Sequence, residues 1–271
     1  MPEQAASVPG PPICLYGSKW QMAPWIIANL PRHRCYVEVF AGSAVVLLRK
    51  PRVPVEYLND RDSDLVTFFE VARDRPEGLA RFLAHSPLSQ AVIESDRPDD
   101  PLVRAAWVFT RSWGRYLGPP RSATFAVSAF RSPARAYERA CERIAAVSER
   151  LRGVVITCLD FRELLPRLDK EGVCFYCDPP YIGEERSYPV CFEREDHAAL
   201  AGSIRALRHA TAAVSYAEQP LIHQLYSDAT IFRRQVRSQI GSAKQTRTEL
   251  LVVTRPRSTR SPCAEVEGGE P

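Results

Sequence analysis

Short runs of apolar residues recur along the middle of the chain, and stretches with helical periodicity separate most of them. Seven runs are rich in Val, Ile, Phe and Tyr and nearly continuous in hydrophobicity, which is typical of strands buried on both faces. They cover residues 35–40, 53–58, 154–159, 173–177, 212–216, 231–236 and 249–254. The helical stretches include 62–74 and 194–209, where apolar residues recur every three or four positions. This alternation predicts an α/β fold with a parallel sheet covered by helices on both faces.

One gap is too long for this pattern. Nearly a hundred residues separate the second and third predicted strands, whereas a crossover needs only about a dozen. We therefore expect a main domain of residues 13–75 and 153–256 and an inserted, mostly helical subdomain of residues 76–152, with helical patterns at 101–112 and 134–151. Residues 1–12, rich in Pro and Ala, and 257–271, without periodicity, are predicted to be a flexible and a disordered tail.

The composition is that of an ordinary globular chain. Of 271 residues, 45% are hydrophobic and 25% charged, which excludes wholesale disorder and a coiled coil. No apolar run approaches the length of a membrane span, and residues 1–12 lack the features of a secretory signal. We therefore expect a cytoplasmic protein without membrane contact, whose eight cysteines are reduced thiols.

Cys174 and Cys177 form a C-x-x-C pattern that invites a metal or redox interpretation. They lie in the predicted strand 173–177, where residues three apart point to opposite faces. Their sulfurs therefore cannot converge, and no second Cys or His pair stands at a zinc spacing. No metal site is expected.

The net charge of +4 does not by itself indicate a nucleic-acid partner, although 32 of the 36 basic residues are arginine. The distribution of charge indicates more. Residues 101–135 carry six arginines and no acid, interleaved with aromatic side chains, and residues 229–248 carry five basic residues and no acid. This pattern suits a surface that meets phosphates and bases. The alternatives are solvated arginines on amphipathic helices and an arginine content set by the base composition of the genome.

The strongest motif is Asp178-Pro179-Pro180-Tyr181, directly after the strand 173–177. Ligands of open α/β sheets bind at the carboxyl ends of strands. The prolines fix the backbone and lack amide donors, which leaves the Pro179 carbonyl and the Asp178 carboxylate as an acceptor pair for an exocyclic amine. Tyr181 adds a flat ring on which a base can stack. Taken alone, the motif could equally be a rigid turn.

Other strand ends add groups that a nucleoside-like cofactor needs. A small-residue turn follows the first strand, and a carboxylate suited to ribose hydroxyls follows the second. The segments are Tyr16-Gly17-Ser18-Lys19, Glu38-Val39-Phe40-Ala41-Gly42-Ser43-Ala44, Asn59-Asp60 and Asp160-Phe161. A lone glycine turn would be weak evidence for such a site, but this ordered set of segments is strong evidence.

With these motifs the chain, from about residue 16 to 256, resembles the Dam-type DNA adenine-N6 methyltransferases of class alpha, with phage and prophage relatives nearest. The resemblance implies a Rossmann-like fold that uses S-adenosylmethionine, with an inserted helical target-recognition subdomain and duplex DNA as substrate. It implies neither a metal nor a covalent nucleophile. We expect a monomer.

The resemblance also assigns roles to residues around the cofactor. Tyr16 and Lys19 would line its methionine end, with Phe40 and Gly42 in the turn beneath it. The remaining cofactor contacts would be Asp60 at the ribose hydroxyls, Asp160 and Phe161 beside the adenine, and Asp178 at the junction with the target.

On the target side, the resemblance makes Asp178, Pro179, Pro180 and Tyr181 the catalytic motif, which holds and stacks the flipped adenine. Residues 233–247 match a hairpin that grips the DNA backbone, with Lys244 and Arg247 as candidate contacts. Arg115 and Arg121 are candidates for contacts to base edges.

The sequence departs from the family pattern at two positions. Ala44 replaces a second glycine and Val39 replaces a proline. Neither change removes a group that the chemistry requires, but both leave open a DNA-binding relative with a decayed active site. Methylation of adenine in RNA is the other alternative, and cytosine-N4 methylation ranks below it because the motif begins with Asp.

Overall fold

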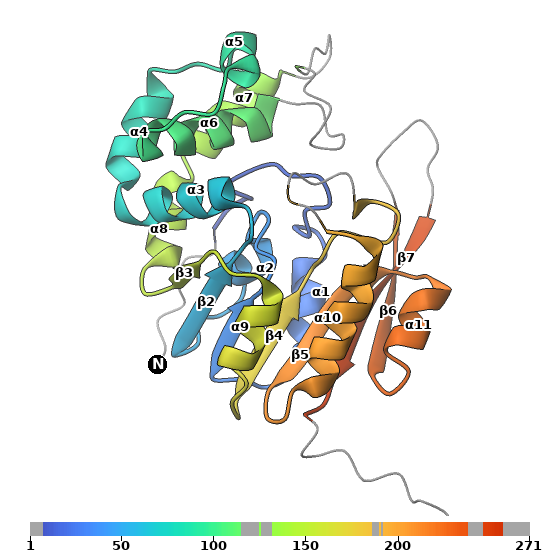
Figure 1. Cartoon of the computed structure of the whole chain (residues 1–271). Coiled ribbons are helices and arrows are strands. Elements are labelled where there is room, and N and C mark those ends of the chain that lie inside the picture. Colours follow the sequence, from blue (N-terminus) through green and yellow to red (C-terminus); the bar gives the residue numbers. More distant parts are fainter. Residues whose placement is uncertain are drawn as a thin grey trace, which may run out of the picture.

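The computed structural model describes residues 8–114, 125, 132–185, 190, 192–237 and 246–256. Within them, all seven predicted strands are present and form one sheet in the order β3-β2-β1-β4-β5-β7-β6 (Figure 1). The strands are β1 (Cys35–Glu38), β2 (Val55–Asn59), β3 (Val155–Thr157), β4 (Val173–Cys177), β5 (Thr211–Ala217), β6 (Thr230–Arg237) and β7 (Thr246–Thr254).

The sheet is mixed rather than wholly parallel, which corrects the expectation from the sequence. Strands β3, β2, β1, β4 and β5 pair in parallel, whereas β7 is antiparallel to both β5 and β6. The reason is connection length, because the segment between β6 and β7 is too short for the crossover that parallel neighbours require. Arg233 and Arg234 are exposed on the edge strand β6, where charge opposes pairing with another sheet.

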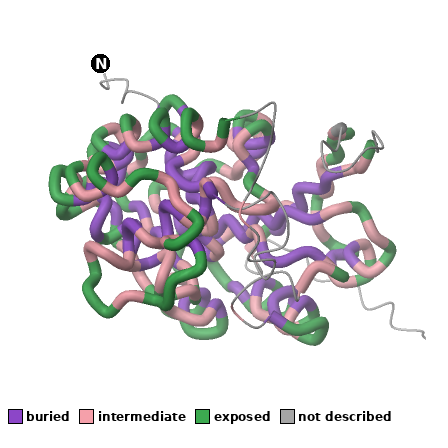
Figure 2. The backbone as a smooth tube through the Cα atoms, turned by 90° about the horizontal axis from the view of Figure 1, so that it is seen from above, coloured by how far each residue is buried: buried purple, intermediate pink, exposed green. Residues whose placement is uncertain are grey.

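Helices cover both faces of the sheet, as predicted. One face packs against α1 (Ala23–Asn29), α2 (Val45–Arg49) and α3 (Ser63–Asp74), and the other against α9 (Phe161–Arg167), α10 (Arg194–Ala206) and α11 (Pro220–Leu225). Buried segments run along the strands, while exposed ones lie on the outer turns of the helices (Figure 2). Strand β4 shows the alternation, since Tyr176 joins the first core and Phe175 and Cys177 the second.

Cys174 lies two residues before Tyr176, so Cys174 and Cys177 occupy opposite faces of β4 and their sulfurs diverge, as predicted. The six cysteines within the described residues are free thiols.

After α3, five helices of the described chain precede β3, in the region predicted as a helical insertion, and they gather at one end of the sheet (Figure 1). They are α4 (Pro76–Ala84), α5 (Gln90–Glu94), α6 (Pro101–Gly114), α7 (Pro133–Cys141) and α8 (Ile144–Leu151). Their apolar side chains continue the core on the α3 face of the sheet. A buried ion network also joins the inserted helices to the sheet. In it, Glu56 of β2 accepts hydrogen bonds from Arg150 of α8 and from Lys50.

The segment before α1 packs against the inserted helices. Val8 is 2% exposed within the core, and the Pro12 carbonyl accepts a hydrogen bond from Trp113 Nε1 at 3.1 Å. Residues 8–12 therefore do not match the flexible tail expected there. Residues 1–7 and 257–271 lie outside the described part of the chain. No helix in the described part is long and apolar enough to cross a membrane.

Candidate active site

A cavity of about 400 Å³ lies at the carboxyl ends of β1, β2, β3 and β4. The strand order reverses between β1 and β4, and open α/β sheets bind ligands at such a switch point. All eight residues predicted to contact a cofactor line the cavity: Tyr16, Lys19, Phe40, Gly42, Asp60, Asp160, Phe161 and Asp178. Pro180 lines it as well. Pro179 and Tyr181 are not among the described residues that line it.

Asn59 braces three of these strand ends. Its side chain is 1% exposed and donates to the carbonyls of Val39 and Leu159 at 2.9 and 3.0 Å. Its Oδ1 accepts from Thr157 Oγ1 and from the Leu159 amide. The ends of β1, β2 and β3 are therefore fixed to one another by a single amide group. The sequence placed Asn59 at a strand end without revealing this role.

Asp60 is held by backbone amides rather than by a cation. Its Oδ2 accepts from the Gly42 amide and its Oδ1 from the Asp62 amide, both at 2.9 Å. Burial raises the pKa of Asp60 to about 6, and these hydrogen bonds oppose the shift. The first bond fixes the turn after β1, where Gly42 adopts a positive φ of 49° that suits a residue without a Cβ.

Ala44, which replaces the glycine expected in the family pattern, also has a left-handed backbone, with φ of 55° and ψ of 24°. For an L-residue this conformation costs about 1–2 kcal/mol. The side chain of Ala44 is fully buried in the core on the α3 face and does not line the cavity. The extra methyl group therefore introduces backbone strain but does not reduce the volume of the cavity.

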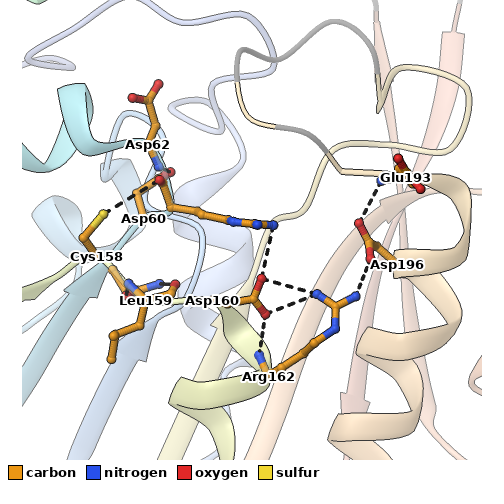
Figure 3. Close-up of polar contacts among 10 residues, drawn as sticks. Asp60, Asp62, Cys158, Leu159, Asp160, Arg162, Glu193 and Asp196 are labelled. Carbon is orange, nitrogen blue, oxygen red and sulfur yellow. Dashed lines mark hydrogen bonds and ion pairs between the residues drawn. The ribbon is translucent and has the colours of Figure 1, made fainter.

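Asp160 is held mainly by cations, in contrast to Asp60 (Figure 3). Its carboxylate caps α9 by accepting from the Arg162 amide at 2.9 Å, and it lies 3.2 Å from the guanidinium groups of Arg61 and Arg162. Arg162 also pairs with Asp196, which accepts from the Glu193 amide at the start of α10. This chain of charges ties the third strand end to α10.

Three aromatic rings meet at the same side of the cavity. Phe40 lies 6.1 Å from Phe161 and 5.9 Å from Phe192 between ring centroids. All three residues line the cavity and offer an apolar surface for a planar group. The sequence analysis missed Phe192, because nothing local to residue 192 indicates which strand end it covers.

Asp178 faces the cavity beside one cation. Lys19 Nζ lies 3.0 Å from Asp178 Oδ1 and donates to the Gly17 carbonyl at 2.8 Å. Burial raises the pKa of the Asp178 carboxyl, Lys19 opposes this shift, and the nearby Glu249 adds to it. An ionised Asp178 can accept hydrogen bonds from a donor in the cavity.

Tyr181 is buried and is not among the described residues that line the cavity. Its ring is 5% exposed, with Lys19 Nζ 4.6 Å from its centroid, and its hydroxyl donates to Glu249 Oε2 at 2.6 Å. Arg247 Nη2 lies 2.6 Å from Glu249 Oε1. The segment Asp178–Tyr181 is thereby fastened to β7, and the stacking role of Tyr181 stays a prediction.

Helix α6 forms a further wall that the sequence analysis did not assign to the cavity. Trp107, Val108, Arg111 and Ser112 line it. The Cys14 amide donates to Ser112 Oγ at 3.3 Å, which fixes the helix against the segment that leads to Lys19. The signal was the acid-free window 101–135, which we interpreted as a nucleic-acid surface. Of the predicted nucleic-acid contacts, Arg115, Arg121 and Lys244 lie outside the described residues.

The chain was compared with solved structures, with curated proteins and with models of protein families. A search of solved structures finds similarity to a precorrin 8w decarboxylase from Methanobacterium thermoautotrophicum, at 12% identity and a TM-score of 0.39 over 93% of this chain and 96% of that one. It also finds similarity to a precorrin-6y C5,15-methyltransferase from Geobacter metallireducens GS-15, at 6% identity and a TM-score of 0.39 over 89% and 93%. A comparison with curated proteins finds no match.

The family model of the D12 class N6 adenine-specific DNA methyltransferases matches residues 16–96 and 116–240, about three quarters of the chain. The match includes every strand end that lines the cavity. The chain therefore belongs to the D12 class N6 adenine-specific DNA methyltransferase family.

Proposed function

We propose that this protein transfers a methyl group from S-adenosylmethionine to the exocyclic N6 amine of an adenine that is flipped out of duplex DNA. The observation that carries the proposal is the position of Asp178. Its carboxylate lines the cavity at the end of β4, beside Lys19 and before two prolines. Family membership supports adenine in DNA as the target.

The cavity suits the proposed cofactor in size and chemistry. Its volume of about 400 Å³ falls within the range of small-molecule sites. Asp60 offers acceptors to ribose hydroxyls, and the rings of Phe40, Phe161 and Phe192 offer an apolar surface to adenine. The excess of carboxylates along the wall suits a ligand with a sulfonium and an ammonium group.

The chemical task of the motif is to activate a poor nucleophile. The lone pair of an adenine N6 amine is delocalised into the ring. Hydrogen bonds from its two N–H groups to the Asp178 carboxylate and the Pro179 carbonyl localise that lone pair and aim it at the methyl group. The cofactor supplies the methyl group: its S–CH₃ bond breaks as the N–CH₃ bond forms, and one amine proton leaves to solvent.

The target must first leave the base stack, at a cost of a few kcal/mol. In the proposed complex Tyr181 stacks on the extruded base, which returns about 1–3 kcal/mol. This requires its ring, now covered by Lys19, to become accessible when the base enters. In the proposed complex, strands β6 and β7, of which β7 contacts Tyr181 through Glu249, lie against the DNA backbone.

The experiment is to incubate the protein with labelled S-adenosylmethionine and either duplex DNA or RNA, and to identify the modified nucleoside after digestion. We expect N6-methyladenine from DNA, lost by at least about 10³-fold in Asp178→Ala because the amine loses its acceptor. Glu195→Gln, which removes an exposed carboxylate that does not line the cavity, is the matched control. Label in RNA alone, or turnover by a folded Asp178→Ala protein, would contradict the proposal. No cofactor binding would favour a decayed relative.

A further inference from the structure

Acidic and basic side chains are unequal in number along the cavity wall. Three basic side chains stand among twice as many acidic ones. The acids are Glu38, Asp60, Asp62, Asp64, Asp160 and Asp178, and the bases are Lys19, Arg61 and Arg111. A ligand with positive charge fits such a wall, but a ligand that also carries a negative group needs one cation that is not already neutralised.

Two of the three cations already face a carboxylate. Lys19 Nζ lies 3.0 Å from Asp178, and Arg61 Nη1 lies 3.2 Å from Asp160. Arg111 differs, because within the described residues it forms no ion pair and donates only to backbone carbonyls. It is therefore the cavity cation whose charge the described part of the protein leaves uncompensated.

The guanidinium of Arg111 is held in place. It lies 4.2 Å from the ring centroid of Trp107, one helical turn earlier on α6, and its Nη1 donates to the Ile93 carbonyl at 2.8 Å. Trp107 is itself anchored, since its Nε1 donates to the Ser95 carbonyl. Both bonds of Arg111 among the described residues start from Nη1, which leaves the Nε–H and Nη2–H edge for a planar anion.

The position along the cavity indicates which anion. Ser112, the residue next to Arg111, accepts from the Cys14 amide, so α6 lies against the segment that carries Tyr16 and Lys19. In the proposed function this segment lines the amino acid end of the cofactor. S-adenosylmethionine has two cationic groups and a single carboxylate, and that carboxylate is at this end.

We propose that Arg111 binds the carboxylate of the cofactor's amino acid end, with Trp107 as the platform that fixes the guanidinium. This inference rests on the proposed function and extends it to a helix outside the family match, because the family model leaves residues 97–115 unmatched. The inserted helices thereby complete the cofactor site of this chain as well as covering the sheet.

The test compares two ligands that differ by the carboxylate. Titration calorimetry measures the affinity of wild-type protein and Arg111→Gln for S-adenosylmethionine and for decarboxylated S-adenosylmethionine. We expect Arg111→Gln to bind the first ligand about 10- to 100-fold more weakly, the range for a lost hydrogen bond between charged groups, and the second with unchanged affinity. Arg104→Gln is the matched control, because Arg104 lies on the same helix, donates to backbone carbonyls and does not line the cavity.

Other outcomes overturn the inference. Equal weakening of both ligands would make Arg111 a structural residue. Unchanged cofactor affinity with weaker, less salt-dependent DNA binding would make it a phosphate contact. Arg111→Lys keeps the charge without the fork, so it should retain intermediate discrimination even if Arg111→Gln fails to fold. Wild-type protein that binds neither ligand would overturn the proposed function as well, whereas unchanged binding by Arg111→Gln overturns only this inference.

Discussion

The two sides of the cavity hold their carboxylates by different means. On the β1–β2 side, Glu38 and Asp60 accept hydrogen bonds from backbone amides and a tyrosine hydroxyl, and burial raises the pKa of both. On the β3–β4 side, Asp160 and Asp178 lie beside basic side chains (Figure 3 shows Asp60 and Asp160). Among the described residues, no basic side chain forms an ion pair with Glu38 or Asp60, whereas Asp160 and Asp178 each pair with at least one.

This difference separates two tasks. Buried carboxylates without a cation nearby gain most from a ligand that brings hydroxyl donors or positive charge, so the β1–β2 side is suited to binding. Burial also raises the pKa of Asp178, but Lys19 opposes this shift and favours the ionised carboxylate, so Asp178 is suited to hold a reacting amine. The predictions that follow alter one side at a time.

Among these changes, the largest effect on cofactor binding is expected at Asp60. Asp60→Ala removes the acceptor that we propose for ribose hydroxyls and leaves the amides of Gly42 and Asp62 without their partner. We expect cofactor affinity, measured by calorimetry, to fall about 10- to 100-fold and the melting temperature to decrease. The wild-type affinity should also fall below about pH 6, where Asp60 protonates, and this dependence should be absent in the variant.

Asp74→Ala serves as the control, because its carboxylate is exposed and, within the described part of the chain, pairs only with Arg73 at the end of α3. Its effect on melting should be small, as for other surface ion pairs. If Asp60→Ala left cofactor affinity unchanged, the β1–β2 side would not be part of the binding site. The assignment of separate tasks to the two sides would then be wrong.

An intermediate effect is expected when the β3–β4 side loses a cation. Lys19→Met takes away the charge 3.0 Å from Asp178, so the pKa of that carboxyl, already raised by burial, should rise further. Activity requires the ionised form, so the acid limb of the pH profile of kcat/KM should move to higher pH by about one unit or more. Lys19→Arg should move it less. An unmoved limb would show that Lys19 does not control the charge of Asp178.

The fold and the strand-end residues could be predicted because both follow from local pattern. Continuous apolar runs identified all seven strands, and the rule that ligands bind at strand ends brought Asp60, Asp160 and Asp178 to one cavity. The antiparallel pairing of β7 with β5 could not be predicted from the apolar runs, because they carry no direction.

The rest of the site depends on contacts between distant segments. Arg111 and Phe192 reach the cavity only through the packing of α6 and of the chain before α10. Tyr181 belongs to the motif that the sequence revealed, but its hydroxyl donates to Glu249, 68 positions away, and local pattern does not show that contact. The acid-free window around Arg111 was visible in the sequence, yet a basic segment indicates an anion without showing whether it is a phosphate or a carboxylate.

The smallest effect is expected at Glu38, and it concerns stability. Burial raises the pKa of Glu38 from its ordinary value to about 8, so the folded protein holds a proton there that the unfolded chain releases above about pH 4.5. The stability from this proton is present below the unfolded pKa and is lost as the pH rises through about 8. In Glu38→Gln, whose amide oxygen can still accept from Tyr36 and the Leu47 amide, this loss should disappear.

The measurement is urea unfolding of wild-type protein and Glu38→Gln between about pH 7 and about pH 9. Asp60 also loses its stabilising proton as the pH rises, but its pKa is about 6. This loss of stability is therefore nearly complete before the interval begins. Any excess fall in the wild-type free energy of unfolding over that of the variant therefore belongs to Glu38. Parallel curves would mean that Glu38 is already ionised in the fold, and the β1–β2 side would then hold its charge as the β3–β4 side does.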